Sequence, residues 1–206
     1  MTTELLMLTQ WLSPAFPLGS YAYSHGLETA ISDGVVADDA ALAAWLETVL
    51  RAGGGWSDAV LLCAAQRGED VVALSRALAA SKERLEETEA QGAAFASTLR
   101  ALGRPVSPVP LPVAVGIATR DMALAPATIA ALYLQSFASN LVSCAVRFVP
   151  LGQSTGQRVL AELSGTITEV AQAASETPVE DLATGAFFSD LSAMAHEAQA
   201  ARVFRT

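Results

Sequence analysis

Few residues of this chain are of a type and spacing that could carry out chemistry. His25 and His196 are the only histidines among 206 residues, and Cys63 and Cys144 are the only cysteines. A tight metal site generally needs three or four convergent ligands, and neither histidine has a second His or Cys at ligand spacing. We therefore expect no metal site within a monomer, although the two histidines can still meet in space or across a dimer.

The lysine content argues against a nucleotide site of the P-loop type. Lys82 is the only lysine, and no Gly-x-x-x-x-Gly-Lys-Ser/Thr motif contains it. In such a motif the lysine contacts the phosphates and the Ser or Thr contacts magnesium. The chain is therefore expected not to bind or hydrolyse nucleotide through a P-loop, and we expect it to use no cofactor.

One group of residues leaves a small hydrolase open as an alternative. Ser24, His25 and Glu28 lie within five residues on one expected helix, residues 20–32. Ser24 and Glu28 share a helix face, but successive helical residues are about 100° apart, so His25 points away from both. No serine lies in a Gly-x-Ser-x-Gly elbow. Because this geometry is poor for a triad, we predict no catalytic residue.

The elements that hold these residues are expected to be helices throughout. Apolar residues recur at three- and four-residue spacing, and no alternating run indicates a strand. Caps and breakers predict one all-α domain over residues 1–206, with about eight to ten helices. A connector at residues 103–112 is too rich in proline for a helix or a central strand. The later expected helices cover residues 82–102, 122–146, 154–174, a short one after Thr177, and 190–201.

Composition and charge narrow the class of partner. Hydrophobic residues make up 52% of the chain and aromatic residues 6%, which favours closely packed helices. The formal net charge of −9 disfavours nucleic acid and anionic membranes as partners but is compatible with a basic protein. Residues 122–146 are uncharged and long enough to span a bilayer, but several polar side chains interrupt them, so we interpret them as a buried helix.

The cysteines and the start of the chain indicate a reducing compartment. Cys63 and Cys144 lie in apolar helical patterns, which favours buried, reduced thiols. The first residues contain an acid where a secretory signal has basic residues. We therefore expect a cytoplasmic protein.

Three segments have compositions typical of contact surfaces. Residues 13–28 surround aromatic side chains with prolines and glycines, as in a recognition loop or a packed connection. Residues 133–158 carry a polar seam that needs hydrogen-bond partners, either inside the fold or on another subunit. The tail at residues 190–206 ends in an amphipathic run. By contrast, the acidic residues of the 82–102 helix are interpreted as a solvated face: Glu83, Glu86, Glu87 and Glu89.

These segments together resemble the urease accessory protein UreF family. The stretches FPLGSYAYSHGLE and LQSFASNLVSCAVRFVPLGQSTGQR are similar to its N-terminal and central signatures. SKERLEETEAQGAAF and DLSAMAHEAQAARVFRT resemble its middle helix and its C-terminal end. Four such segments in order make the resemblance specific, although Pro110-Leu111 departs from the family pattern in the connector. A generic helical scaffold unrelated to urease is the remaining alternative.

The resemblance implies an all-α, homodimeric, chaperone-like adaptor. Such a protein joins a UreD-type (also called UreH-type) accessory protein and the GTPase UreG on apo-urease, where nickel is inserted. The tail residues Arg202, Phe204 and Arg205 would then dock into the UreD-type partner. The dimer interface would include Gln135, Ser139, Asn140 and Arg147. A surface facing the GTPase would comprise Phe16, Pro17, Gly19, Ser20, Tyr21, Ser24, Gly26 and Glu28.

Overall fold

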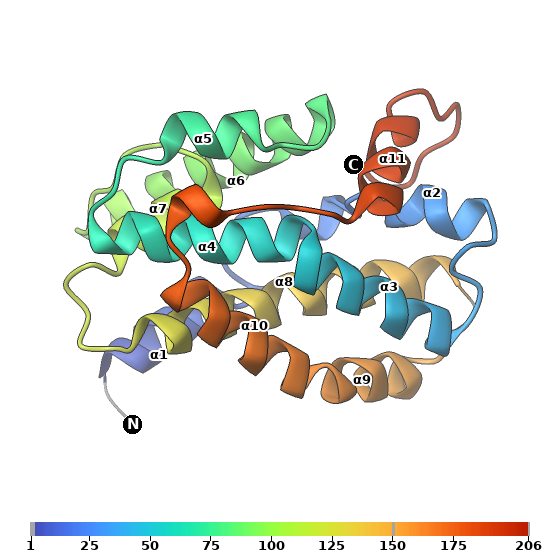
Figure 1. The fold of residues 1–206 in the computed structure, drawn as a ribbon, viewed down its shortest axis with the longest axis horizontal. Helices are drawn as coiled ribbons and strands as arrows, with labels where there is room; N and C mark the ends of the chain where they lie inside the picture. Colours follow the sequence, from blue (N-terminus) through green and yellow to red (C-terminus); the bar gives the residue numbers. More distant parts are fainter. Residues whose placement is uncertain (1–2, 150, 206) are drawn as a thin grey trace.

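The computed structural model describes residues 3–149 and 151–205; residues 1, 2, 150 and 206, which the expected domain includes, lie outside it. Within these ranges the chain forms eleven α-helices, two short 3-10 helices and no β-strand, so the predicted all-α class is confirmed (Figure 1). The N-terminal half contains α1 (Thr3–Trp11), η1 (Ser20–Ala22), α2 (Leu27–Ser32), α3 (Asp39–Ala52), α4 (Gly54–Arg67), α5 (Val72–Ala77) and α6 (Lys82–Ala101). The C-terminal half contains α7 (Leu111–Ala118), α8 (Pro126–Phe148), α9 (Gln153–Glu162), α10 (Ser164–Glu176), η2 (Val179–Asp181) and α11 (Phe187–His196).

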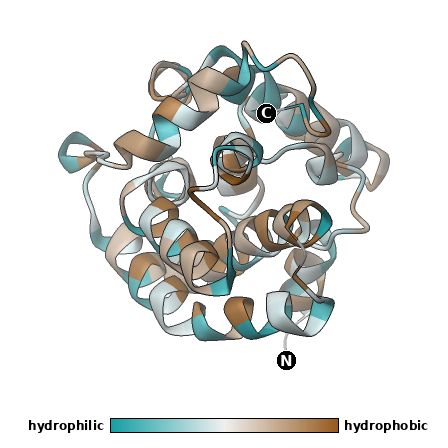
Figure 2. Cartoon of the chain, turned by 90° about the vertical axis from the view of Figure 1, so that its right-hand side faces the viewer, coloured by the Kyte–Doolittle hydropathy of each residue, from teal (hydrophilic) through white to brown (hydrophobic). Residues whose placement is uncertain are grey.

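Helices α4 and α8 form the centre of the bundle. α4 packs against α3, α7, α8 and α10, and α8 also packs against α1, α2 and α9. α7 approaches α4 so closely that a Cβ on Gly116 would lie 2.3 Å from the carbonyl oxygen of Leu62. Looking along the bundle, several helices are seen end-on, and hydrophobic and hydrophilic residues alternate around them (Figure 2). The buried core is built mainly from aliphatic side chains, as the composition predicts.

α8 corresponds to the helix expected over residues 122–146, but it begins at Pro126 and ends at Phe148, so it includes Arg147. It is the one described helix that is long and apolar enough, by length and composition, to cross a membrane. Half of its most apolar 18-residue window is buried inside the fold. Because it contacts six other helices of the bundle, α8 is a core helix here.

Several expected helices differ in the structure. The helix expected over residues 20–32 is divided into η1 and α2, with His25 between them at φ of +58°. The helix expected over residues 190–201 is α11, which covers Phe187–His196. The predicted helix at residues 154–174 is divided into α9 and α10 around Leu163. After Thr177 only the 3-10 helix η2 forms, because the hydroxyl of Thr177 donates to Ala173 O at the end of α10 and does not cap a new helix. The chain then runs to α11, and the N–H groups of Gly185 and Ala186 donate to Ala52 O at the end of α3.

Both cysteines are buried, as predicted. Burial raises the pKa of the Cys63 thiol to about 11 and that of the Cys144 thiol to about 12. Neither thiol is therefore a nucleophile near neutral pH, since the thiolate is the reactive form.

Candidate partner-binding surfaces

The N-terminal signature at residues 13–28 is divided between the surface and the interior. Tyr21 is 68% exposed and Pro17 is also exposed, whereas Gly19 and Ser20 are half-buried. The other four residues expected to face the GTPase are buried in the monomer: Phe16, Ser24, Gly26 and Glu28. The part of this predicted surface that is available to a partner therefore centres on Tyr21.

Gly26 lets the start of α2 rest directly on α11. It has φ of +76°, a conformation that L side chains rarely adopt. A Cβ at this position would lie 2.5 Å from the backbone nitrogen of Ala193 in α11. Gly26 of the signature therefore permits a close contact with α11, a helix near the other end of the chain.

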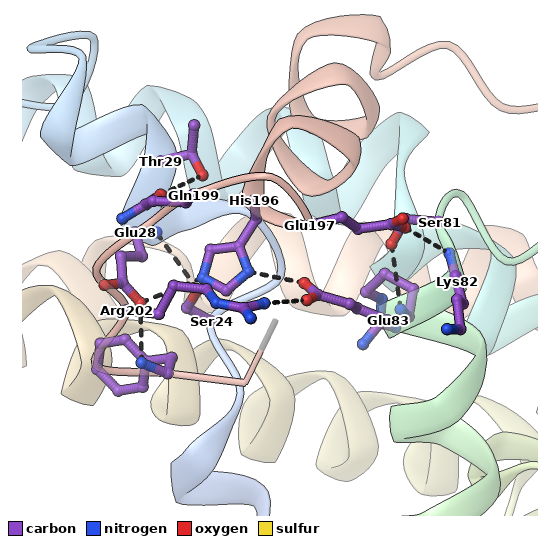
Figure 3. A network of polar contacts seen from close by, with 12 residues as sticks. Ser24, Glu28, Thr29, Ser81, Lys82, Glu83, His196, Glu197, Gln199 and Arg202 are labelled. Atoms are coloured by element: carbon purple, nitrogen blue, oxygen red, sulfur yellow. Dashed lines mark hydrogen bonds and ion pairs between the residues drawn. The ribbon is translucent and has the colours of Figure 1, made fainter.

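The carboxylate of Glu28 binds the C-terminal tail (Figure 3). Its two oxygens accept the N–H groups of Val203 at 2.7 Å and Phe204 at 2.8 Å. Nε2 of His196 lies 3.2 Å from the same carboxylate, and the side chains of Glu28 and His196 are both 0% exposed. Hydrogen bonds to an ionised acceptor are the strong ones in a low-dielectric interior, so Glu28 is a specific anchor for the tail.

Glu83 completes this anchor from α6. Its carboxylate lies 2.7 Å from Nδ1 of His196 and 2.5 Å from the guanidinium of Arg202. The interpretation of the α6 acids as a solvated face is therefore wrong for Glu83, and also for Glu87, which is 2% exposed. Glu86 is exposed, as expected. Sequence reasoning missed Glu83 and His196 because their partners are more than a hundred residues away.

The remaining tail residues predicted to dock a partner differ in exposure. Phe204 is buried beside the ring of Phe148, with the guanidinium of Arg147 over its face, 5.7 Å from the centroid. Arg205 has an exposed side chain, and its N–H donates to Ala22 O at 2.7 Å. The tail therefore lies folded on the chain next to the N-terminal signature.

The polar seam of α8 faces the same signature. Asn140 donates to the carbonyl of Tyr23 at 3.0 Å, and Arg147 donates to the carbonyl of Tyr21 at 3.1 Å. Ser139 and Gln135 are half-buried. A surface cavity of about 90 Å³ lies between α8 and the loop before η1, lined among others by Phe16, Tyr21, Ser139, Asn140 and Arg147. The residues predicted for the dimer and for the GTPase surface thus form one continuous region.

A second buried polar cluster joins the signature to α6. Nε2 of His25 lies 2.8 Å from the Glu87 carboxylate and 2.9 Å from the Arg84 guanidinium, which is also paired with Glu87. Burial lowers the pKa of His25, and Arg84 lowers it further. Burial opposes ionisation of Glu87, but Arg84 and His25 outweigh it and hold the pKa at about 2. The cluster therefore contains a buried ion pair between the Arg84 guanidinium and the Glu87 carboxylate.

Asp58 and Tyr133 extend this cluster. The phenol donates to the Asp58 carboxylate at 2.8 Å, and burial raises the pKa of Asp58 to about 6. Two further cavities of about 90 and 50 Å³ share His25, Asp58, Arg84 and Thr88 in their walls. Within residues 3–149 and 151–205, no group of three or more His, Cys, Asp and Glu side chains is placed to hold a metal ion.

Comparison with known proteins assigns the chain to a protein family. A model of the UreF family matches residues 36–164. A urease accessory protein UreF of Cereibacter sphaeroides strain ATCC 17029 is 54% identical over the full length of both chains. The chain belongs to the UreF family. Further UreF proteins are 52% identical in Jannaschia sp. strain CCS1, covering all of this chain and 96% of the relative, and 44% identical in Mesorhizobium japonicum, covering 98% and 96%.

Membership of the UreF family confirms the resemblance stated from four sequence segments. The family model itself begins after the N-terminal signature, but the relatives align over the signature and the tail as well. A scaffold unrelated to urease is thereby set aside. The chain is an accessory protein of urease and not an enzyme.

The geometry also gives no support to the hydrolase alternative. Ser24 Oγ accepts the backbone N–H of Glu28 at 3.3 Å, while the Glu28 carboxylate faces His196 and the tail. His25 instead faces Glu87 and Arg84. Ser24, His25 and Glu28 are adjacent in sequence, but the carboxylate and the imidazole serve two different clusters.

Proposed function

We propose that this chain is the adaptor of a urease maturation complex. It joins a UreD/UreH-type accessory protein and the GTPase UreG on apo-urease, so that nickel can be inserted as cargo. One observation supports this most directly: the N-terminal signature, the C-terminal tail and the α8 seam form one contiguous, hydrogen-bonded region. An adaptor needs its binding segments on one body with a defined relative orientation.

We assign each partner to a part of this region. The GTPase contacts the exposed portion of the signature around Tyr21, and the UreD-type protein contacts the tail and its exposed arginine Arg205. A second copy of the chain binds along the side of α8 that carries Ser139 and Arg147. Ser139 and Arg147 both line the cavity beside the signature. An aromatic ring or an arginine of the second copy can therefore enter this cavity.

The residues of the chain indicate which steps of maturation its partners carry out. GTP hydrolysis belongs to the partner, because the only lysine is not part of a P-loop. Nickel is handed on within the complex, in keeping with the absence of a group of three or more possible ligands among residues 3–149 and 151–205 of a single copy. We place the assembly in the cytoplasm, where buried reduced thiols such as Cys63 and Cys144 are maintained.

Co-expression tests this proposal. The chain is produced with the UreD-type protein and UreG, and the product is analysed by size-exclusion chromatography with light scattering. We expect a stable complex whose mass contains two copies of the chain and both partners. Separate elution of all three proteins, or a complex that forms equally well without this chain, contradicts the adaptor role.

A further inference from the structure

His25 is the only residue other than glycine in the described part of the chain whose backbone has a positive φ. Its φ is +58°, and Gly26 follows with φ of +76°. These two residues make the turn between η1, which carries Tyr21, and α2, which carries Glu28. Gly26 permits the close contact with α11, but a left-handed histidine is uncommon and persists only where its surroundings hold it.

The imidazole of His25 is held between two helices. Its Nε2 lies 2.8 Å from the Glu87 carboxylate and 2.9 Å from the Arg84 guanidinium, both on α6. The ring of Phe137 on α8 packs against it edge to face, with the ring centroids 4.8 Å apart. Because these contacts come from elements outside the signature, they fix the turn at His25 against the helical core.

Histidine suits this position because its ring can satisfy either neighbour on α6. Burial and Arg84 lower the pKa of His25, so the ring is neutral at pH 7. Nε2 then donates to the Glu87 carboxylate in one tautomer and accepts from the Arg84 guanidinium in the other. Asparagine would tolerate the same backbone conformation, but it is too short to place a donor where Nε2 lies.

The turn at His25 determines how Tyr21 is presented. Arg147 and Asn140 of α8 bind the carbonyls of Tyr21 and Tyr23 and hold the loop along that helix. The side chain of His25 ties the same loop to α6. If residue 25 relaxed to a negative φ, the peptide units before it would rotate relative to α2, and Tyr21 would move with them.

We propose that His25 is a positioning residue for recruitment of the GTPase: held by Arg84 and Glu87, it fixes the orientation in which Tyr21 meets UreG. This inference rests on the proposed adaptor function, in which the GTPase contacts the signature around Tyr21. His25 is buried and acts without touching the partner. Its effect on UreG passes through Tyr21, as for a group whose supporting contacts set the geometry of a binding residue.

A double-mutant cycle between His25 and Tyr21 tests this proposal. The chain is purified in complex with the UreD-type protein, and the affinity for UreG is measured for the native chain, His25→Asn, Tyr21→Ala and the double variant. We expect His25→Asn to weaken UreG binding roughly threefold to tenfold in the native chain and to have no further effect in Tyr21→Ala. Binding of the UreD-type protein should stay unchanged.

Gln91→Leu is the matched control. Gln91 is 6% exposed, and its amide donates at 2.8 Å to the same Glu87 oxygen that His25 faces, but it lies on α6 itself. Both substitutions remove one hydrogen bond from this carboxylate and should lower the melting temperature alike, whereas only His25→Asn should weaken UreG binding. If His25→Asn does not fold, Phe137→Leu removes the ring edge from the imidazole and takes its place in the same cycle.

The outcomes separate this inference from the adaptor proposal. If the native complex does not bind UreG, or if Tyr21→Ala binds it as well as the native chain does, the proposed GTPase surface is wrong and this inference fails with it. If Tyr21→Ala weakens binding and His25→Asn does not, only the role of His25 is wrong. Equal losses from His25→Asn in the native chain and in Tyr21→Ala, or a similar loss from Gln91→Leu, would show that His25 supports the fold in general and would also overturn the inference.

Discussion

The buried carboxylate of Glu28 joins two parts of the chain that lie 175 residues apart. In sequence it belongs to a signature that resembles a contact surface, yet in the structure it is almost completely enclosed. Its three polar partners come from α11 and the tail. The first consequence of changing this residue should therefore be release of the tail, and any effect on a partner should follow from that.

We predict that Glu28→Gln lowers the free energy of unfolding by roughly 2–3 kcal/mol, because backbone donors lose a charged acceptor. Amide exchange of Val203 and Phe204 should accelerate more than that of the α4 core. Urea unfolding and hydrogen exchange measure the two effects. Glu197→Gln is the matched control, since this exposed carboxylate accepts only the N–H of Lys82. Slow exchange at Val203 in Glu28→Gln contradicts the anchor.

A second residue-scale prediction concerns the pH dependence of stability. Burial raises the pKa of Asp58 from 3.8 to about 6, so the folded state binds this proton more tightly than the unfolded state. The group therefore costs stability as the pH rises from about 4 to about 6. Asp58→Asn keeps an acceptor for Tyr133 and removes this cost. Its unfolding free energy at pH 7 should exceed that of the native chain by up to an amount on the order of 2 kcal/mol.

The comparison at pH 4 provides the control for that prediction. There Asp58 is largely protonated in the folded protein, so the asparagine variant and the native chain should be nearly equal in stability. Urea unfolding at both pH values measures the difference. A variant that is less stable than the native chain at pH 7 would show that the charge of Asp58 is needed by Arg84, and the prediction would be wrong.

At the scale of elements, local patterns located most helices because those helices carry local signals. Ser81 caps α6 by accepting the N–H of Arg84, and the long apolar pattern of α8 continues to Phe148. The break between α9 and α10 occurs at Leu163, where no Gly or Pro marks it in the sequence. The nearby Gly165 lies inside α10. The positions of α2, α6 and α11 relative to one another depend on contacts between distant residues, and no spacing in the sequence encodes these.

We predict that Gly26→Ala displaces α11 from α2. The new Cβ combines a left-handed backbone conformation with overlap against Ala193, at a cost of roughly 2–4 kcal/mol. Gly34→Ala is a close control, because Gly34 has a similar φ of +74° and no neighbouring atom within 4 Å. Calorimetry should show a larger loss of melting temperature for Gly26→Ala. Equal losses for both variants would mean that backbone strain alone is responsible.

At the scale of the whole molecule, the N-terminal signature at residues 13–28 and the C-terminal tail meet on one side of the helical core. The N-terminal signature contacts α8 through backbone carbonyls and contacts α11 and the tail through Gly26, Glu28 and Ala22. Such an arrangement holds several surfaces in a fixed relative orientation. Many residues of each predicted surface, however, make contacts within the monomer. The exposed groups that remain for partners are therefore few, and their side chains can be changed without disturbing the fold.

Tyr21 is the clearest case of such a group. The residue is 68% exposed, and its backbone carbonyl accepts a hydrogen bond from Arg147, a contact that does not depend on the side chain. We predict that Tyr21→Ala weakens recruitment of the GTPase roughly tenfold, as expected for an aromatic contact, and leaves the melting temperature and binding of the UreD-type protein unchanged. Val35→Ala, at another exposed position, should change neither interaction. Titration of each variant with the two partners separately measures this. Loss of both partners together would mean that Tyr21 supports the shape of the whole region, and separate surfaces for the two partners would then be ruled out.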